Sequence, residues 1–170
     1  MHESPDDLER LQTILDDSAR EAGSHLSSII TPERRLDAAE LCGVVQGLCL
    51  IAVATVTADG RPLVGPVDGF LIRGSMYFSS GKSSVRMRHL EKRPGVSASY
   101  VPHERLAVSF HGEAALFEMS EAEHGAALRE AMLDHYVPLQ GPAFEEWLDR
   151  SDAVGARIEA RRIFTFHMPD

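Results

Sequence analysis

The fold is decided by residues 53–100, which read VATVTADGRPLVGPVDGFLIRGSMYFSSGKSSVRMRHLEKRPGVSASY. Within them, Asp59-Gly60 separates two apolar runs, and this dipeptide is a strong hairpin signal because both central residues of the turn take positive φ. A second turn is expected at residues 73–75, which read RGS. The stretch therefore predicts three strands joined by tight turns, then a loop that holds Lys82 and a short helix after it.

The loop after the third expected strand gathers groups that bind anions. Residues 80–84 read SGKSS, so hydroxyls, backbone N–H groups and a cation lie where a helix begins. Exposed N–H groups and the helix dipole favour negative charge at that place. Lys82, Arg86 and Arg88 belong to a basic cluster that continues to Arg93. These residues predict a local phosphate site, and the alternative is a solvated basic face of the helix.

The overall composition excludes several kinds of partner. The chain has 17 Lys and Arg residues against 26 Asp and Glu residues, which gives a formal net charge of −9. Such a charge repels nucleic acid and anionic membrane surfaces alike. The first residues lack a signal-peptide pattern and no apolar run is long enough to span a membrane, so a cytoplasmic protein is expected. Cys42 and Cys49 lie in apolar surroundings without metal-ligand spacing, and both are expected to be reduced and buried.

Two helices are expected before the first strand. Ser4, Pro5 and Asp7 form a helix start, and apolar residues follow at helical spacing until Gly23. This pattern predicts an amphipathic helix packed on the outside of the domain. A second helix is expected from Thr31 to the glycines near residue 43.

The strands that flank the first hairpin differ in kind. Residues 49–57 are almost all apolar or β-branched, which predicts a strand buried on both faces. The prolines and glycines of residues 62–72, Gly65-Pro66 above all, predict a bend where a ligand can approach the backbone. Residues 96–119 alternate apolar and polar positions, and this alternation changes parity at His111-Gly112, which predicts a β-bulge.

Two further helices are expected after the fifth strand. Ser120 and Glu123 predict a capping box for the first of them. Residues 141–142 read GP and begin the second, whose Phe144 and Trp147 are expected to face inward.

Together these elements predict one domain over residues 1–170. Its parts are an N-terminal helical segment at 1–43, barrel strands at 48–119 and 157–167, and a helical insertion at 120–150. Strands that follow one another, without regular alternation with helices, predict a mainly β fold with added helices. We therefore expect an antiparallel β-barrel with peripheral helices.

Several short motifs resemble one known family. They are TADGRP at 57–62, PV at 66–67, MYFSS at 76–80 and SVR at 84–86, followed by HL and PGV. Their order and spacing resemble the flavin-binding split-barrel family, the group around pyridoxamine-phosphate oxidase and the deazaflavin-dependent reductases. The resemblance covers residues 39–119, and residues 157–166 more loosely. It implies that the barrel is the antiparallel split β-barrel that binds FMN.

The resemblance also implies a homodimer that holds FMN in a groove between its subunits. The loop and helix after the third strand would hold the phosphate, and the second strand would run alongside the isoalloxazine ring. The residues implied for the phosphate are Ser79, Ser80, Lys82, Ser84, Arg86 and Arg88. The residues implied beside the ring are Val64, Gly65, Pro66 and Val67.

Two positions depart from the oxidases proper. Val85 stands where they have a second basic residue, and Gly65 stands where they have a phosphate-binding arginine. These departures favour a general flavin or deazaflavin binder over pyridoxamine-phosphate oxidation itself. The leading hypothesis is an FMN-dependent oxidoreductase of unknown substrate. The alternatives are a reductase that uses the deazaflavin coenzyme F-420, and a flavin or haem carrier without turnover.

Four other residues leave two interpretations open. His103 and His111 are candidate ligands or acid–base groups, although histidines in a turn or at a bulge are commonly solvated or hydrogen-bonded. Tyr136 and Trp147 are candidates to stack on a ring, or else belong to the core. The sequence has no His and Cys cluster with metal-ligand spacing, so no metal site is expected.

Overall fold

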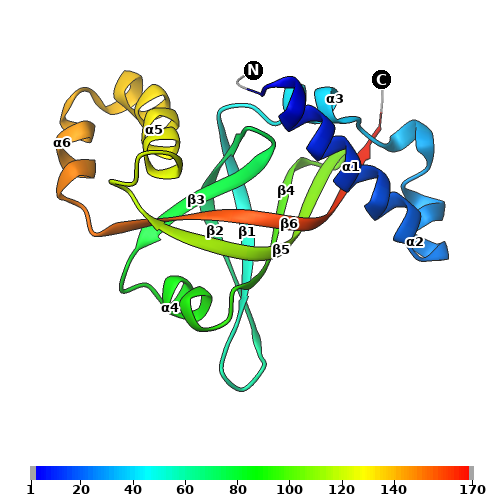
Figure 1. Ribbon diagram of the computed structural model, residues 1–170, viewed down its shortest axis with the longest axis horizontal. Helices are drawn as coiled ribbons and strands as arrows, with labels where there is room; N and C mark the ends of the chain where they lie inside the picture. The colour runs from blue at the N-terminus through cyan, green and yellow to red at the C-terminus, as the bar shows by residue number, and fades with distance from the viewer. Residues whose placement is uncertain (1–2, 169–170) are drawn as a thin grey trace.

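The architecture is a closed antiparallel barrel of six strands in the order β1-β2-β3-β6-β5-β4 (Figure 1). The computed structural model describes residues 3–168, so residues 1–2 and 169–170 of the expected domain lie outside the described part. The strands are β1 (Leu48–Val56), β2 (Pro62–Ile72), β3 (Ser75–Gly81), β4 (Gly95–His103), β5 (Leu106–Glu118) and β6 (Ala153–His167). The expected mainly β split barrel with peripheral helices is therefore confirmed.

Helices surround this barrel at three places. They are α1 (Pro5–Glu21), α2 (Ser24–Ile29), the 3-10 helix η1 (Pro32–Arg34), α3 (Ala38–Val44), α4 (Val85–Lys92), α5 (His124–Gln140) and α6 (Ala143–Arg150). Figure 1 shows α1–α3 at one end of the barrel and α5–α6 at the other, with α4 between β3 and β4 along the chain. No helix within residues 3–168 is long and apolar enough to cross a membrane.

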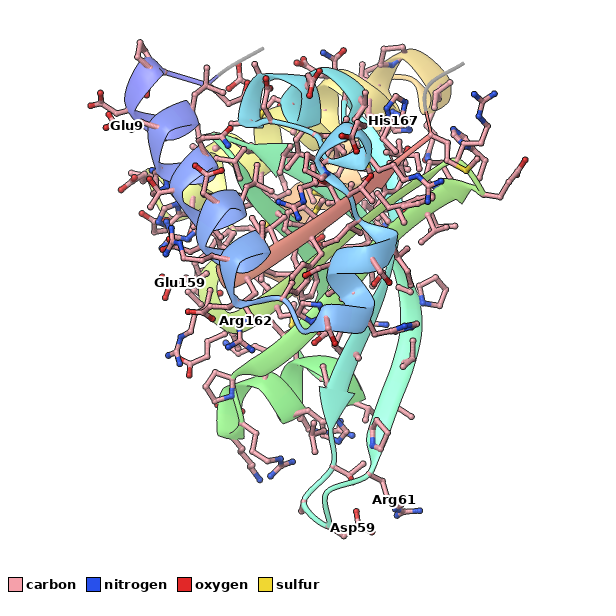
Figure 2. The ribbon with its side chains drawn as sticks, turned by 90° about the vertical axis from the view of Figure 1, so that its right-hand side faces the viewer. Glu9, Asp59, Arg61, Glu159, Arg162 and His167 are labelled. Atoms are coloured by element: carbon pink, nitrogen blue, oxygen red, sulfur yellow. The ribbon has the colours of Figure 1, made fainter. Side chains whose placement is uncertain are left out.

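Both tight turns occur where the sequence predicts them. Gly60 has the expected positive φ, +83°, whereas Asp59 does not, so the expectation of positive φ at both central residues is wrong for Asp59. The backbone N–H of Thr57 donates to the carbonyl of Arg61 at 2.9 Å. Asp59 and Arg61 form an ion pair at the tip of this hairpin, which projects beyond the barrel (Figure 2). In the second turn Arg73 and Gly74 have φ +49° and +71°. The left-handed backbone that each turn requires is thus supplied mainly by glycine.

The predicted bulge in β5 is confirmed. The pairing of β5 with β6 shifts register between His111 and Gly112. A Cβ atom at position 112 would lie 2.1 Å from the carbonyl oxygen of Glu159, so only glycine fits at this crossing. The bulge lets β5 bend across the barrel and pair with most of the length of β6.

The start of α1 agrees with the sequence, but the helix expected from Thr31 is wrong. Ser4 and Asp7 form the capping box of α1. In place of one helix from Thr31 there are η1 and α3, and Asp37 and Glu40 form a new capping box at the start of α3. The backbone N–H of Leu36 donates to Thr165 Oγ1 of β6 at 2.9 Å, which keeps the chain extended between η1 and α3.

The expectation that β1 is buried on both faces is also wrong. Cys49, Ile51 and Val53 are buried, whereas Leu50 is 62% exposed and Val56 is 38% exposed. Burial alternates because only one face of the strand points into the barrel. The apolar run of β1 therefore leaves an exposed apolar outer face.

Two expectations for the C-terminal helices are corrected by the structure. The expected capping box of Ser120 and Glu123 does not form at the start of α5. Instead, the Glu121 carboxylate accepts the backbone N–H groups of Glu123 and His124 at 3.0 and 2.8 Å. Trp147 does not face inward and is 56% exposed, while its neighbours on α6, Phe144 and Leu148, are buried.

The last strand begins at Ala153, earlier than residue 157. Its first residues pair with the end of β3, Gly81 with Ala153 and Ser79 with Gly155. Side chains outside the barrel form a second apolar cluster that joins α5 and α6 to β2 and β3; its members are Phe70, Ile72, Tyr77, Leu128, Met132, Phe144 and Leu148. This cluster fixes the helices against the sheet and positions the site described next.

Candidate functional site

A pocket of about 920 Å³ lies between the barrel and the α5–α6 helices. Its barrel wall comes from Leu50 of β1, from β2, from the end of β3 and from the start of α4. The lining residues on this wall include Leu50, Pro66, Val67, Asp68, Ser79, Ser80 and Arg86. Those on the helical wall include Met132, Tyr136, Gln140, Phe144, Trp147 and Leu148. The pocket is therefore polar where β3 meets α4 and mainly apolar along the helices.

Arg86 supplies the positive charge of the polar end. Its Nη2 lies 3.4 Å from the carbonyl oxygen of Pro66 on β2. The guanidinium has no ion-pair partner within residues 3–168, and partial burial lowers the pKa of Arg86 from its usual value. An arginine remains charged in proteins, so this half-buried cation is well placed to receive an anion.

Serine hydroxyls lie beside this cation. Ser84 caps α4 by accepting the backbone N–H of Met87 at 3.3 Å, and Ser80 donates to Ser84 Oγ at 3.1 Å. Ser79 lines the large pocket and makes a weak contact of 3.8 Å with Met132 Sδ. The Ser84 hydroxyl hydrogen and the lone pairs of Ser80 stay available to a ligand, because these two hydrogen bonds do not use them.

A smaller pocket of about 200 Å³ adjoins the large one at Arg86. It is lined by Val64, Gly65, Ser84 and Arg86, among others. Pro66 and Val67 line the large pocket instead. The four residues implied beside the ring thus lie along both pockets, with Arg86 between them.

Lys82 and Arg88 point elsewhere. Lys82 Nζ pairs with Glu118 at 3.1 Å, and its side chain is 68% exposed. The Arg88 guanidinium donates to the carbonyl of Ser83 and is exposed. Neither side chain lines the two pockets described above. The structure therefore brings together Ser79, Ser80, Ser84 and Arg86, and leaves the other two cations outside this group.

The helical wall contains residues to which the sequence gives no firm role. The Tyr136 hydroxyl donates to the Asp68 carboxylate on β2, and the pKa of Tyr136 is raised by burial first and by this hydrogen bond second. The rings of Tyr136 and Phe144 are stacked with centroids 4.6 Å apart, and Trp147 follows at 5.4 Å from Phe144. One feature of the sequence indicates that Asp68 belongs to the site. It lies two residues after Pro66, and residues two apart on a strand share the same face.

The two candidate histidines lie away from the large pocket. His111 Nδ1 is 2.9 Å from Ser97 Oγ, and burial lowers its pKa. His103 Nδ1 accepts the backbone N–H of Arg105 at 3.3 Å. Both histidines are therefore hydrogen-bonded within the barrel strands, and neither lines the pocket that holds Arg86.

Comparison with known families identifies the fold. The family described as pyridoxamine 5'-phosphate oxidase matches residues 40–165 of this chain. The chain belongs to this family. No curated protein sequence matches it.

Solved structures share this fold of the pyridoxamine 5'-phosphate oxidase family. Conserved hypothetical protein Rv2991 of Mycobacterium tuberculosis is 22% identical with a TM-score of 0.65, over 82% of this chain and 92% of that one. HutZ, the haem storage protein of Vibrio cholerae, is 20% identical with a TM-score of 0.57, over 68% and 84%. A protein described as F420 reductase is 19% identical with a TM-score of 0.54, over 71% and 93%. At these identities the likeness concerns the fold alone.

Gly65 lies against the Arg86 side chain. A Cβ atom at position 65 would lie 2.9 Å from Arg86 Nη2, which is the far end of a flexible side chain. The positive charge beside this part of β2 comes from α4. Within residues 3–168 no group of three His, Cys, Asp or Glu side chains is placed to hold a metal ion.

Proposed function

We propose that this chain binds FMN in the large pocket and acts as an FMN-dependent oxidoreductase. The observation that carries the proposal is the half-buried Arg86 guanidinium, which has no ion-pair partner in the described chain and lies beside Ser80 and Ser84. A phosphate at this place would accept charge-assisted hydrogen bonds worth roughly 1.5–3 kcal/mol each before ordering costs. The same residues would discriminate FMN from a flavin without phosphate.

The remaining space and chemistry fit a flavin. Small-molecule pockets commonly measure about 300–1,000 Å³ and are mainly apolar with few polar groups. The pocket of about 920 Å³ meets both conditions, with Pro66 and Val67 on the barrel wall and apolar side chains such as Met132 on the helical wall. Bound FMN would supply hydride transfer, and the chain would supply position, phosphate contacts and exclusion of water.

A homodimer is part of this proposal. Exposed apolar side chains lie on the outer faces of β1 and β2 and toward the end of β4: Leu50 (62%), Val64 (64%) and Val101 (59%). Contiguous exposed apolar surface on a folded protein commonly marks an interface. Leu50 also lines the large pocket, so a second copy seated on β1 would close the open side of the cofactor site.

Coenzyme F-420 is the second candidate cofactor. The fold likeness to a protein described as F420 reductase supports it, and that deazaflavin also presents a phosphate-bearing tail to a cation. Haem is the third, supported by the fold likeness to HutZ. The described lining of the large pocket includes no histidine or cysteine, and its side chains of the types that ligate haem iron are Met132 and Tyr136.

The absorbance spectrum of the purified protein separates these candidates. We expect a yellow protein whose chromophore, released by denaturation, co-elutes with FMN, and a mass in solution of twice 18.7 kDa. A colourless protein that binds added F-420 but not FMN would move the assignment to the deazaflavin. A bound flavin that no nicotinamide donor reduces would indicate a carrier. Protein that fails to bind micromolar FMN at all would overturn the proposal.

A further inference from the structure

The part of the large pocket farther from Arg86 has its own chemistry. It lies between Asp68 on β2 and the aromatic residues Tyr136, Phe144 and Trp147 on α5 and α6. Arg86 contacts the carbonyl of Pro66, two residues before Asp68 on the same strand. Since a strand rises about 3.3 Å per residue, the backbone positions of Pro66 and Asp68 are roughly 7 Å apart along β2, and the two side chains approach the pocket from different places on the strand.

The aromatic wall ends in a ring that is open to the pocket. Tyr136 stacks on Phe144, and Phe144 lies beside Trp147, so three rings follow one another along the helices. Trp147 is 56% exposed although Phe144 and Leu148, on the same short helix, are buried. An exposed aromatic face at the end of such a series can stack on a planar ligand, and among aromatic side chains tryptophan attracts a cation most strongly.

Asp68 gives this wall a negative charge. The carboxylate is exposed and has no ion-pair partner among residues 3–168. The carboxylate accepts a hydrogen bond from the Tyr136 hydroxyl. An ionised carboxylate has about four acceptor positions, so most of its capacity is available to a ligand.

We propose that this part of the pocket binds planar aromatic cations, such as aminoacridines or aromatic amidines, which are protonated at neutral pH. The ring of the ligand stacks on Trp147, and its N–H groups donate to Asp68. An aromatic anion is rejected because it would desolvate the carboxylate and gain no partner there. This proposal names the class of substrate that would lie beside the flavin. It rests on the proposed function, because the ligand is a substrate only of a flavin enzyme.

The alternative is that Asp68 and Tyr136 only fasten α5 to β2. In that case the loss of either partner of the hydrogen bond has the same effect. The variants Asp68→Asn and Tyr136→Phe separate the two cases, because the first removes the charge and the second removes only the hydroxyl. Glu130→Gln is the matched control, since Glu130 is an exposed carboxylate on α5 outside the pocket lining.

The probes are proflavine, a planar tricyclic cation, and anthraquinone-2-sulfonate, a planar tricyclic anion. Calorimetry gives each dissociation constant with and without saturating FMN, and the emission of the single tryptophan, Trp147, reports contact at the wall. We expect proflavine to bind and to quench Trp147, with affinity at least tenfold lower in Asp68→Asn. Tyr136→Phe and Glu130→Gln should stay within about threefold of the unmodified protein, a difference of under 1 kcal/mol.

Two results would overturn the inference: binding of anthraquinone-2-sulfonate as tight as that of proflavine when saturating FMN already occupies Arg86, or equal losses of proflavine affinity in Asp68→Asn and Tyr136→Phe. Thermal melting of each variant shows whether it is folded, and a misfolded Asp68→Asn is replaced by Asp68→Ser. The two proposals fail separately. Protein that binds FMN but does not select proflavine removes the aromatic-cation class alone, whereas selective proflavine binding without FMN binding removes the flavin function and leaves the cation site.

Discussion

The two groups of helices at the ends of the barrel are attached in different ways. At one end α1 buries Leu11 and Leu15 in the main core, and Ser18 Oγ accepts the backbone N–H of Ile163 on β6 at 2.9 Å. Arg162 on β6 also pairs with Glu21 at the end of α1 (Figure 2). At the other end α5 and α6 pack through the smaller cluster outside the barrel and leave Trp147 exposed on the pocket wall.

This difference assigns a role to each group. The N-terminal helices complete the core, since their apolar side chains belong to the same cluster as the barrel interior. The C-terminal helices pack on the outside of the sheet through the smaller cluster and form one wall of the pocket. Substitutions in α1 should therefore change the free energy of unfolding more than ligand binding, and substitutions at the exposed surface of α6 should do the reverse.

Leu11→Ala should have the largest effect on stability. Leu11 is 1% exposed, and removing a buried leucine side chain leaves a cavity, so we expect a loss of about 2–5 kcal/mol in the free energy of unfolding. Urea denaturation of the two proteins measures this loss. Leu139→Ala is the control, because Leu139 on α5 is 70% exposed and should change stability by less than about 0.5 kcal/mol. Comparable losses in both variants would contradict the division between the two ends.

Ser18→Ala should have the next largest effect. The substitution leaves the buried backbone N–H of Ile163 without the Ser18 hydroxyl as its acceptor, which lowers the free energy of unfolding by about 1–3 kcal/mol. Thr13→Ala on the same helix removes a hydroxyl that is bonded only to the carbonyl of Glu9, and should be close to neutral. Thermal unfolding compares the two. If both variants have the melting temperature of the unmodified protein, the hydrogen bond from β6 to Ser18 does not hold α1 in place.

Trp147→Leu should barely change stability although it removes the largest side chain of α6. The expected change is within about 0.5 kcal/mol, because more than half of the ring is already in water. Phe144→Leu, at its buried neighbour, should destabilise more than this. The same denaturation measurement serves both. A large loss for Trp147→Leu would show that the ring belongs to the core and not to an open wall.

The pH dependence of α5 should be the smallest effect. Backbone N–H groups of Glu123 and His124 lower the pKa of Glu121 below its usual value. Because the folded pKa is depressed, the stabilisation is present above the unfolded value of about 4.3 and is lost as the pH falls through the folded value. We expect the difference in melting temperature between the unmodified protein and Glu121→Gln to shrink from pH 6 to pH 3. A constant difference would contradict this role.

Much of the fold followed from local chemistry in the sequence. Glycine at position 60 and the parity change at Gly112 identify the hairpin and the bulge, because each depends on one backbone conformation or one close contact. The break after η1 could not be predicted, since it depends on a hydrogen bond from Leu36 to Thr165, distant along the chain. Tertiary contacts override local helix signals in such cases.

The candidate site was less predictable than the fold. The motifs locate Arg86 and the serines near one another, but they do not show that Lys82 pairs with Glu118 on β5. The second wall comes from α5 and α6, whose packing on β2 and β3 depends on apolar residues far apart in the chain, such as Phe70 and Leu128. Their spacing in the sequence does not indicate that they are in one cluster. Residues that are close only in space therefore remained outside the prediction.

The most direct test of the central claim compares FMN with riboflavin, which lacks the phosphate. Arg86→Ala should weaken FMN binding by about 10- to 150-fold, the equivalent of roughly 1.5–3 kcal/mol, and riboflavin binding by less than about threefold. Arg88→Ala, at an exposed cation of the same helix, is the control and should change neither. Titration by quenching of flavin fluorescence gives all six dissociation constants. Equal losses for FMN and riboflavin in Arg86→Ala would contradict a phosphate site at Arg86.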